Sequence, residues 1–400
     1  MTGIFHTHLI MALLVATAAG CTASGGSKAG DDATPIDSAT SPVDTTLDSI
    51  TDTVTGPEDA ASTPDTPSPS DTQSPPESDA TPAADTKPPE EDATSLPEAV
   101  GSIFEKAQFE VKVTEDIVFG QGLTHSTWNA NDGEPMDLLL DVYQPVRDAP
   151  PPMPVVVVIH GGGFVGGTHK HAQLSSMAKG FAERGWVAFS IDYRVAKHAG
   201  TLPPGYPELD GEEAGIAQAE QWNALYPACR DAKAAIRWIR SKADTYSLAT
   251  DHITAIGGSA GSFIAVALGV SNEDDCVTEI SDEADPTLAG THLDQSSKIH
   301  TIIDHWGGPA ILTMLNVINP GDRFDASDPP LSIVHGTEDP IVPFTSAEDL
   351  KAAYDASGAP YTFTPLAGDG HGPWAAKVNG KSLAQLAFDF IVKHQKLTAE

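Results

Sequence analysis

Ser259 stands in residues 257–261, GGSAG, directly after the apolar run 253–256 and before an apolar stretch that begins at Phe263. A strand, a tight glycine turn and a helix in this order form the context in which a serine hydroxyl is held out as a nucleophile. The glycines avoid Cβ clashes in the turn, and the start of the helix offers free N–H groups to developing negative charge. The five residues alone are a weak signal, because similar turns also serve close packing.

Candidate partners for this serine follow two later apolar runs. Asp339 comes shortly after the run 331–334, and His371 comes shortly after the run 361–366. A serine hydroxyl is a poor nucleophile at neutral pH, so a base must take its proton and a carboxylate must orient that base. The chain order therefore predicts Ser259 as nucleophile, Asp339 as orienting acid and His371 as base. Asp369 competes for the role of the acid, but Asp339 follows a separate strand and is better placed.

A second glycine-rich turn, residues 160–163 (HGGG), follows the apolar run 155–159. The tetrahedral intermediate of acyl transfer needs hydrogen-bond donors for its oxyanion. We expect the N–H groups of Gly162, Gly163 and Ala260 to supply them, since Ala260 directly follows the candidate nucleophile. His160 is expected to anchor this turn rather than to act as a second base.

The elements that must position these residues can be inferred from hydrophobic patterning. The runs 155–159, 186–191, 253–256, 299–303 and 331–334 are apolar on both faces, as a parallel sheet covered by helices requires. Helical spacing recurs between them, for example at Leu174, Met177, Ala178 and Phe181. Two earlier strands, expected near 109–119 and 136–143, fit an antiparallel edge hairpin. The prediction is a doubly wound, mostly parallel α/β sheet with antiparallel N-terminal edge strands and the site at the carboxyl ends of its strands.

These motifs resemble those of the α/β-hydrolase esterases with an HGGG oxyanion loop, which include the hormone-sensitive-lipase-like bacterial esterases and the acetyl/feruloyl esterase relatives. Besides HGGG and GGSAG, the segments 140–145 (LDVYQP) and 190–194 (SIDYR) carry the resemblance, which extends over roughly 111–393. It implies an α/β-hydrolase fold and a cofactor-free, metal-free serine carboxylic-ester hydrolase that forms an acyl-enzyme. Short-chain or carbohydrate-linked (acetyl or feruloyl) esters are the implied substrates.

Two other functions stay open at this point. One is amide or peptide hydrolysis on the same fold, and the other is a non-catalytic surface binding protein on a hydrolase scaffold, although all three triad candidates are present. The formal net charge of −34, from 22 basic and 56 acidic residues, argues against nucleic-acid partners. The oligomeric state is not predicted.

Several other side chains near strand ends have plausible structural roles. His169 and His171 lack a third convergent ligand, so we expect solvated histidines rather than a metal site. Asp304 is expected to line the cleft or to cap a helix, and Phe164 and Trp306 to form a substrate pocket or simply to pack. The long segment 195–227 is expected to be a loop over the cleft, in which Tyr206, Trp222 and Tyr226 contact substrate unless the loop is decorative.

The N-terminal region predicts export. Residues 9–19 form an apolar run with the length of a signal-peptide core, and Ala18-Ala19-Gly20 precede Cys21 in the manner of a bacterial lipobox. We therefore expect a signal peptide over 1–21, with Cys21 lipidated and the protein held at the periplasmic face or the cell surface; simple secretion is the alternative. Residues 22–98 are rich in Pro, Ser, Thr and Asp and predict a disordered acidic linker, followed by a catalytic domain over 99–400.

The two remaining cysteines, Cys229 and Cys276, flank the candidate nucleophile region. In an exported protein such a pair can form a disulfide, but the spacing of their Cβ atoms is not known from sequence. The alternatives are a disulfide and two buried thiols.

Overall fold

The structure is a computed structural model that describes residues 100–206 and 216–400. The expected signal peptide, the lipidation site Cys21 and the expected linker 22–98 therefore lie outside the described residues. Among the residues that are described, none of the helices combines the length and the apolar character needed to cross a membrane.

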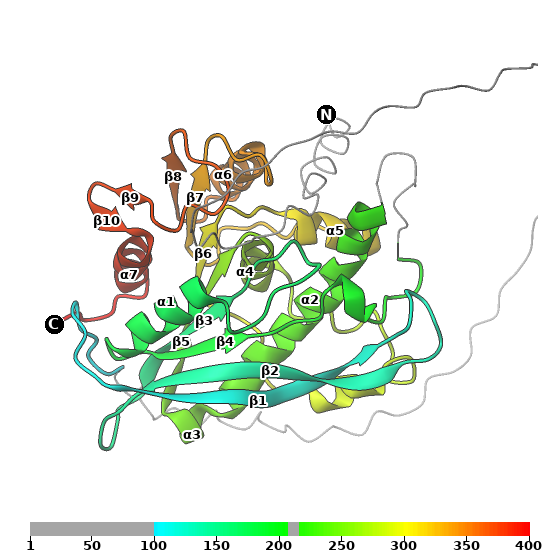
Figure 1. Ribbon diagram of the computed structural model, residues 1–400, viewed down its shortest axis with the longest axis horizontal. Helices are drawn as coiled ribbons and strands as arrows, with labels where there is room; N and C mark the ends of the chain where they lie inside the picture. Colours follow the sequence, from blue (N-terminus) through cyan, green and yellow to red (C-terminus); the bar gives the residue numbers. More distant parts are fainter. Residues whose placement is uncertain (1–99, 207–215) are drawn as a thin grey trace, which may run out of the picture. The chain divides into compact units, whose positions relative to one another are not determined.

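The described part of the chain is organised around one eight-stranded sheet with the strand order β1-β2-β4-β3-β5-β6-β7-β8 (Figure 1). β1 pairs antiparallel with β2, β2 pairs antiparallel with β4, and the other neighbours all pair in parallel. The prediction of a mostly parallel sheet with antiparallel edge strands is confirmed. The strands of the sheet are β1 (Val111–Thr124), β2 (Glu134–Pro145), β3 (Met153–Ile159), β4 (Val187–Ile191), β5 (Leu248–Gly258), β6 (Thr301–His305), β7 (Leu331–Gly336) and β8 (Tyr361–Leu366).

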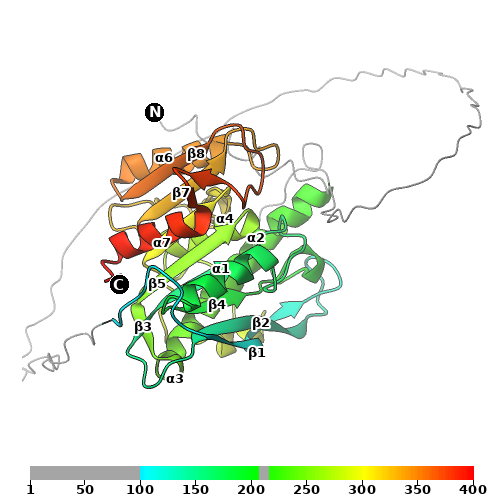
Figure 2. The same cartoon turned by 60° about the vertical axis from the view of Figure 1, so that its left-hand side comes forward.

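The helices form one layer on each face of this sheet (Figures 1 and 2). The face that contains the side chains of Val156 and Val158 of β3 is covered by α1 and α7. The face that contains Val155, Val157 and Ile159 is covered by α2, α4, α5 and α6. The helices are α1 (Ala172–Ala182), α2 (Ile216–Ser241), α3 (Ala243–Tyr246), α4 (Ala260–Val270), α5 (Ala310–Ile318), α6 (Thr345–Ser357) and α7 (Leu383–His394). Short 3₁₀ turns lie at Ala196–His198 and Pro286–Gly290, and a small hairpin of β9 (Lys377–Val378) and β10 (Lys381–Ser382) precedes α7.

The sequence pattern explains this layering. All five residues of the run 155–159 are fully buried, because consecutive side chains of a strand point to opposite faces and both faces are covered. The helical spacing expected around Leu174 is likewise found, since Leu174, Met177, Ala178 and Phe181 form the buried side of α1. Strong local patterns thus placed the central elements correctly.

β1 departs from the simple alternation expected for it. Its pairing with β2 shifts register between Thr114 and Ile117 and again between Val118 and Gly120. Such bulges interrupt the regular alternation of faces along a strand. Val113 is 40% exposed. The expected start at residue 109 was also two residues early.

The expected long loop 195–227 is another correction. α2 already begins at Ile216 and continues through Pro227, so the helix does not start near Cys229. A proline inside a helix removes one backbone hydrogen bond, but the first half of α2 buries Trp222, Leu225 and Tyr226 in the core, which offsets this cost. Trp222 and Tyr226 are nearly or fully buried and pack beside Tyr206, whose hydroxyl donates to the carbonyl of Trp222. These three aromatic side chains pack against one another in the structure.

Cys229 and Cys276 are both buried free thiols. Burial and the neighbouring thiol of Cys229 raise the pKa of Cys276, so this side chain is held as a neutral, unreactive thiol. Of the two sequence alternatives, the structure has the pair of buried thiols and not the disulfide.

A buried ion pair joins the end of the sheet to α2. The guanidinium of Arg194 donates to both carboxylate oxygens of Asp231 at 2.7–3.1 Å, and both side chains are almost fully buried. The Asp231 carboxylate also accepts the backbone N–H of Arg194 at 2.8 Å.

We expect Asp231→Ala to lower the free energy of unfolding by about 3–5 kcal/mol, because it leaves a buried guanidinium unpaired. Urea unfolding followed by circular dichroism measures this loss. Asp389→Ala is the matched control, since Asp389 pairs with Lys381 at the surface and its loss should cost less than about 1 kcal/mol. Equal losses in the two variants would show that the buried pair contributes no more to the free energy of unfolding than the surface pair does.

Candidate active site

Ser259 occupies the turn between β5 and α4 in a strained backbone conformation. Its φ of 56° and ψ of −124° are rare for a residue with a side chain. Its N–H donates to the carbonyl of His305 on the neighbouring strand, and its own carbonyl accepts from Ser262 in the first turn of α4. The strain is therefore held by bonds on both sides of the residue, as in the expected strand–turn–helix context.

The glycine loop after β3 passes directly over this turn. A Cβ on Gly161 would lie 2.7 Å from the carbonyl oxygen of Gly258 and 3.2 Å from the Cβ of Ser259. Gly162 has a φ of 116°, and a Cβ there would meet the carbonyl oxygen of Gly166 at 2.3 Å. Glycine is required here because the backbone of the loop must approach the serine closely.

The loops after β7 and β8 bring Asp339 and His371 to Ser259. The Nε2 atom of His371 lies 2.9 Å from the Ser259 hydroxyl oxygen, and its Nδ1 atom lies 2.7 Å from Oδ2 of Asp339. Both distances are within hydrogen-bond reach. The structure thus joins the three residues predicted from sequence into one chain of hydrogen bonds, although Ser259 and His371 are 112 residues apart.

The surroundings of Asp339 keep it ionised. Burial opposes ionisation, but contacts with His335 and His371 and the backbone N–H of Ile341 outweigh it and hold the pKa of Asp339 below its ordinary value. The N–H groups of Ile341 and Val342 donate to Oδ1 at 2.8 and 3.0 Å, while Oδ2 lies 2.7 Å from Nδ1 of His371 and 3.4 Å from Nε2 of His335. An ionised Asp339 accepts the Nδ1 proton of His371, so the free lone pair on Nε2 faces Ser259.

Hydrogen bonds within the glycine loop orient its N–H groups. The carbonyl of Gly161 accepts from the His160 ring at 2.7 Å, and the carbonyl of Gly162 accepts from the N–H groups of Val165 and Gly166. In a trans peptide the N–H points away from the preceding carbonyl. The N–H groups of Gly162 and Gly163 consequently point away from these partners, and no acceptor for them is found among the described residues.

Gln221 was not predicted from the sequence. It lies on α2, is 3% exposed, and donates from Nε2 to the carbonyl of Gly163 at 2.8 Å. The contact fixes a further peptide of the glycine loop. No pattern in the sequence pointed to Gln221, because α2 was expected to begin after this residue.

Four other candidate residues have structural roles. Asp304 is fully buried and accepts the N–H of Gly307 at 3.0 Å, so it caps a turn, and burial raises its pKa to about 6. Phe164 and Trp306 are each 1% exposed and belong to the packing beneath the site. Asp369 contributes its backbone carbonyl to the loop of Asp339, through the N–H of Glu338, while the hydrogen bond to His371 comes from Asp339.

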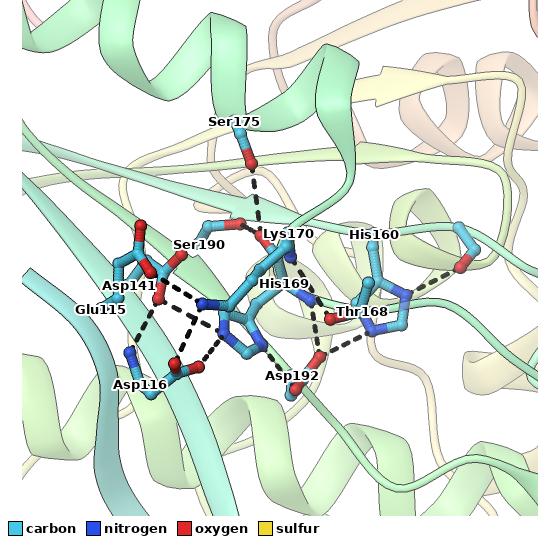
Figure 3. A network of polar contacts seen from close by, with 11 residues as sticks. Glu115, Asp116, Asp141, His160, Thr168, His169, Lys170, Ser175, Ser190 and Asp192 are labelled. Atoms are coloured by element: carbon cyan, nitrogen blue, oxygen red, sulfur yellow. Dashed lines mark hydrogen bonds and ion pairs between the residues drawn. The ribbon is translucent and has the colours of Figure 1, made fainter. Parts of the chain in front are cut away.

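The expectation of solvated histidines at 169 and 171 is wrong for His169, which is 3% exposed. Its imidazole lies among the carboxylates of Asp116, Asp141 and Asp192 (Figure 3). Atoms of Asp116, Asp141 and His169 lie within 4.8 Å of one another, as metal ligands could. The ring already contacts all three carboxylates, however, and Lys170 already neutralises Asp116.

Comparison with known protein families supports a relationship to esterases. Residues 140–204 and 217–322 match the family model BD-FAE. Esterase LipQ of Mycobacterium tuberculosis is 25% identical over 298 residues, which cover 70% of this chain and 62% of LipQ. Esterase LipC of the same organism is 24% identical, covering 58% of this chain and 56% of LipC. The chain therefore spans less than two thirds of these relatives.

Solved structures support the same fold. Esterase 2 of Thermogutta terrifontis has a TM-score of 0.50 in a structure phosphorylated by paraoxon, at 24% identity over 70% of this chain and 96% of that one. A structure of it phosphonylated by cyclosarin has a TM-score of 0.51, at 23% identity over 74% and 98% of the two chains. Together with the strand order, these likenesses show that the chain has the α/β-hydrolase fold, and the family match and the similarity to LipQ and LipC relate it to esterases.

Proposed function

We propose that the protein is a serine carboxylic-ester hydrolase that works through an acyl-enzyme. The observation that carries this proposal is the continuous hydrogen-bond chain from Ser259 through His371 to Asp339, with distances of 2.9 and 2.7 Å. A scaffold used only for binding has no need to keep a strained serine next to a correctly oriented imidazole. The relatedness to esterases supports the same reaction class.

The acylation half of the reaction follows from this geometry. His371 takes the proton of the Ser259 hydroxyl at Nε2 as the oxygen attacks the ester carbonyl. Asp339 stabilises the resulting imidazolium through Nδ1. The N–H groups of Gly162, Gly163 and Ala260 donate to the oxyanion, and the positive end of α4 adds to its stabilisation. Collapse of the intermediate passes the proton from His371 to the leaving alcohol.

Deacylation repeats these steps with water in place of serine. His371 takes a proton from a water molecule, which attacks the acyl carbonyl, and the same three N–H groups hold the second oxyanion. The proton then returns to the oxygen of Ser259, which leaves as the acid is released. Ser259, His371 and Asp339 are thereby restored.

The substrates we propose are short-chain or carbohydrate-linked esters. The charge of −34 disfavours strongly anionic substrates, because the chain repels them at long range. A screen of p-nitrophenyl esters of increasing acyl length, alongside acetylated and feruloylated oligosaccharides, ranks these substrates by kcat/KM.

Ser259→Ala is expected to lower ester hydrolysis by a factor on the order of 10⁴–10⁶, because the nucleophile is removed. A fluorophosphonate probe should label the wild type at Ser259 and leave the variant unlabelled. Ser176→Ala, at an exposed position of α1, is the control and should keep both activity and labelling. If the purified Ser259→Ala variant kept near wild-type turnover, Ser259 would not be the nucleophile.

Asp339→Asn should reduce kcat by roughly 10⁴-fold, since an amide no longer holds the productive tautomer of His371. Asp369→Asn should have a far smaller effect, because the side chain that bonds to His371 in this structure is Asp339. Steady-state kinetics of the two variants on one soluble ester test this ranking. The reverse ranking would move the role of the acid to Asp369.

For the N-terminal region we propose export and lipid anchoring at Cys21. The support is its position directly after an apolar run and three small residues, with an acidic, proline-rich segment after it. Lipid chains on Cys21 would hold the domain at a membrane while the segment 22–98 acts as a spacer.

Expression in a bacterium with labelled palmitate tests this anchor. Wild-type protein should incorporate label and partition into detergent, whereas Cys21→Ala should do neither. Free, unlabelled wild-type protein in the periplasm, with an N-terminus other than Cys21, would reduce the signal to ordinary secretion.

A further inference from the structure

Asp192, directly after β4, contacts both ends of the segment that contains the glycine loop. At the first end, its Oδ1 atom lies 3.4 Å from Nε2 of His160, whose other ring nitrogen bonds to the carbonyl of Gly161. At the second end, Oδ1 accepts the backbone N–H of His169 at 2.6 Å, and Oδ2 lies 2.6 Å from Nδ1 of the His169 ring. One carboxylate therefore bonds to the His169 end of residues 160–169 and lies within ion-pair distance of the His160 end (Figure 3).

The His169 ring faces carboxylate oxygens with both of its nitrogens. Nδ1 contacts Asp192, and Nε2 lies 3.1 Å from Oδ1 of Asp116 on β1 and 3.3 Å from Oδ1 of Asp141 on β2. A neutral imidazole has only one N–H donor, so its other nitrogen would present a lone pair to a carboxylate. Only the imidazolium, which donates from both nitrogens, satisfies all of these contacts.

The other charged groups around the ring come from the same elements. Lys170, next in the chain, contacts Asp116 and Glu115 at 3.0 and 3.1 Å and offsets part of the negative charge of β1. From β4 and α1, the hydroxyls of Ser190 and Ser175 donate to the carbonyl of His169. Across Asp192, His160 is the other titratable group of this network.

These surroundings decide how the network responds to pH. Burial lowers the pKa of His169, but contact with Asp192 and the charges of Asp141 and Asp116 outweigh burial and raise the pKa above its ordinary value. A group with a raised folded pKa stabilises the fold fully below its unfolded pKa, and this contribution is lost as pH rises through the folded pKa. The contacts of His169 that hold the end of the glycine loop should therefore weaken as the pH rises through the pKa of His169.

We propose that His169, in its imidazolium form, is a positioning residue that holds the oxyanion donors in place through Asp192 and His160. The inference rests on the proposed hydrolase function, since it concerns the donors of that reaction. His169 does not touch the substrate. Loss of the Nε2 proton removes the contacts of the ring with Asp116 and Asp141 and leaves this end of the loop held by Asp192 alone, which weakens the alignment of the Gly162 and Gly163 N–H groups with the oxyanion.

The consequence is an alkaline limit on activity set by His169. Efficient hydrolysis requires a protonated His169, so kcat plotted against pH should fall on the alkaline side as His169 loses its proton. Because the donors act on the transition state more than on the bound ester, the alkaline fall should be in kcat, with KM nearly constant.

Two variants test this through their pH profiles. His169→Gln should lower the plateau of kcat by roughly 10-fold to 100-fold, within the cost of losing one oxyanion donor, and should abolish the alkaline fall. His171→Gln, whose native ring packs on Trp374 instead, is the matched control and should keep both the plateau and the alkaline fall. Asp141→Asn removes one of the carboxylates at Nε2, so the alkaline fall should move to lower pH with the plateau retained.

A direct titration completes the test. With ¹³C-labelled histidine, the ring signal of His169 in the Ser259→Ala protein, assigned by its absence from His169→Gln, should titrate at the pH of the alkaline fall in the wild type. A ring that is neutral throughout the active range, or an alkaline fall unmoved by both His169→Gln and Asp141→Asn, would overturn the proposal. If the wild type hydrolyses no ester, the proposed function fails and the positioning role fails with it, while the titration still decides whether His169 is charged.

Discussion

The close approach of the ends of β3 and β5 is the constraint on which the site depends. A Cβ on Gly261, in the first turn of α4, would lie 2.1 Å from the carbonyl oxygen of Ile159 at the end of β3. A Cβ on Gly257 would likewise lie 2.2 Å from the backbone of Gly261. A side chain at Gly261 would force α4 away from the end of β3 and the glycine loop away from Ser259, and a side chain at Gly257 would force the start of α4 away from β5. Gly257 and Gly261 of the GGSAG motif are thus required by backbone packing, which keeps the glycine loop beside Ser259.

Much of this arrangement could be predicted from the sequence because its signals are local. A strand buried on both faces must be apolar along its whole length, so the central strands stood out as short continuous runs. Parallel strands end at the same edge of the sheet, so residues that follow separate runs were expected to meet there. This rule alone predicts that Ser259, Asp339 and His371 lie close together, without knowledge of any contact between them.

What could not be predicted depends on pairings between distant segments. The bulges of β1 are set by its register with β2, which no short pattern in β1 records. The extension of α2 through Pro227 depends on the core that Trp222 and Tyr226 enter, and tertiary burial outweighed the local signal of the proline. His169 was misjudged for the same reason, since its three carboxylates come from β1, β2 and the end of β4.

The acidic composition makes pairings between residues from distant segments especially important. The chain has only 22 basic residues against 56 acidic ones, and several of the basic side chains are buried. Arg194 pairs with Asp231, Arg230 with Asp285, and Arg323 with Asp275 in the interior. Each of these pairs removes one basic and one acidic side chain from the surface, so the pairs leave the acidic excess of the chain unchanged. Clusters of carboxylates near the sheet edge must then find positive charge locally.

His169 and His371 show how the number of nearby carboxylates separates two roles for one residue type. His371 has one carboxylate on one nitrogen and a hydroxyl on the other, so its second nitrogen is free to accept a proton. His169 has carboxylates on both nitrogens, so both must donate. The first arrangement suits a base that changes its protonation in every cycle. The second suits an imidazolium that donates from both nitrogens, and the proposed reaction uses the two states side by side.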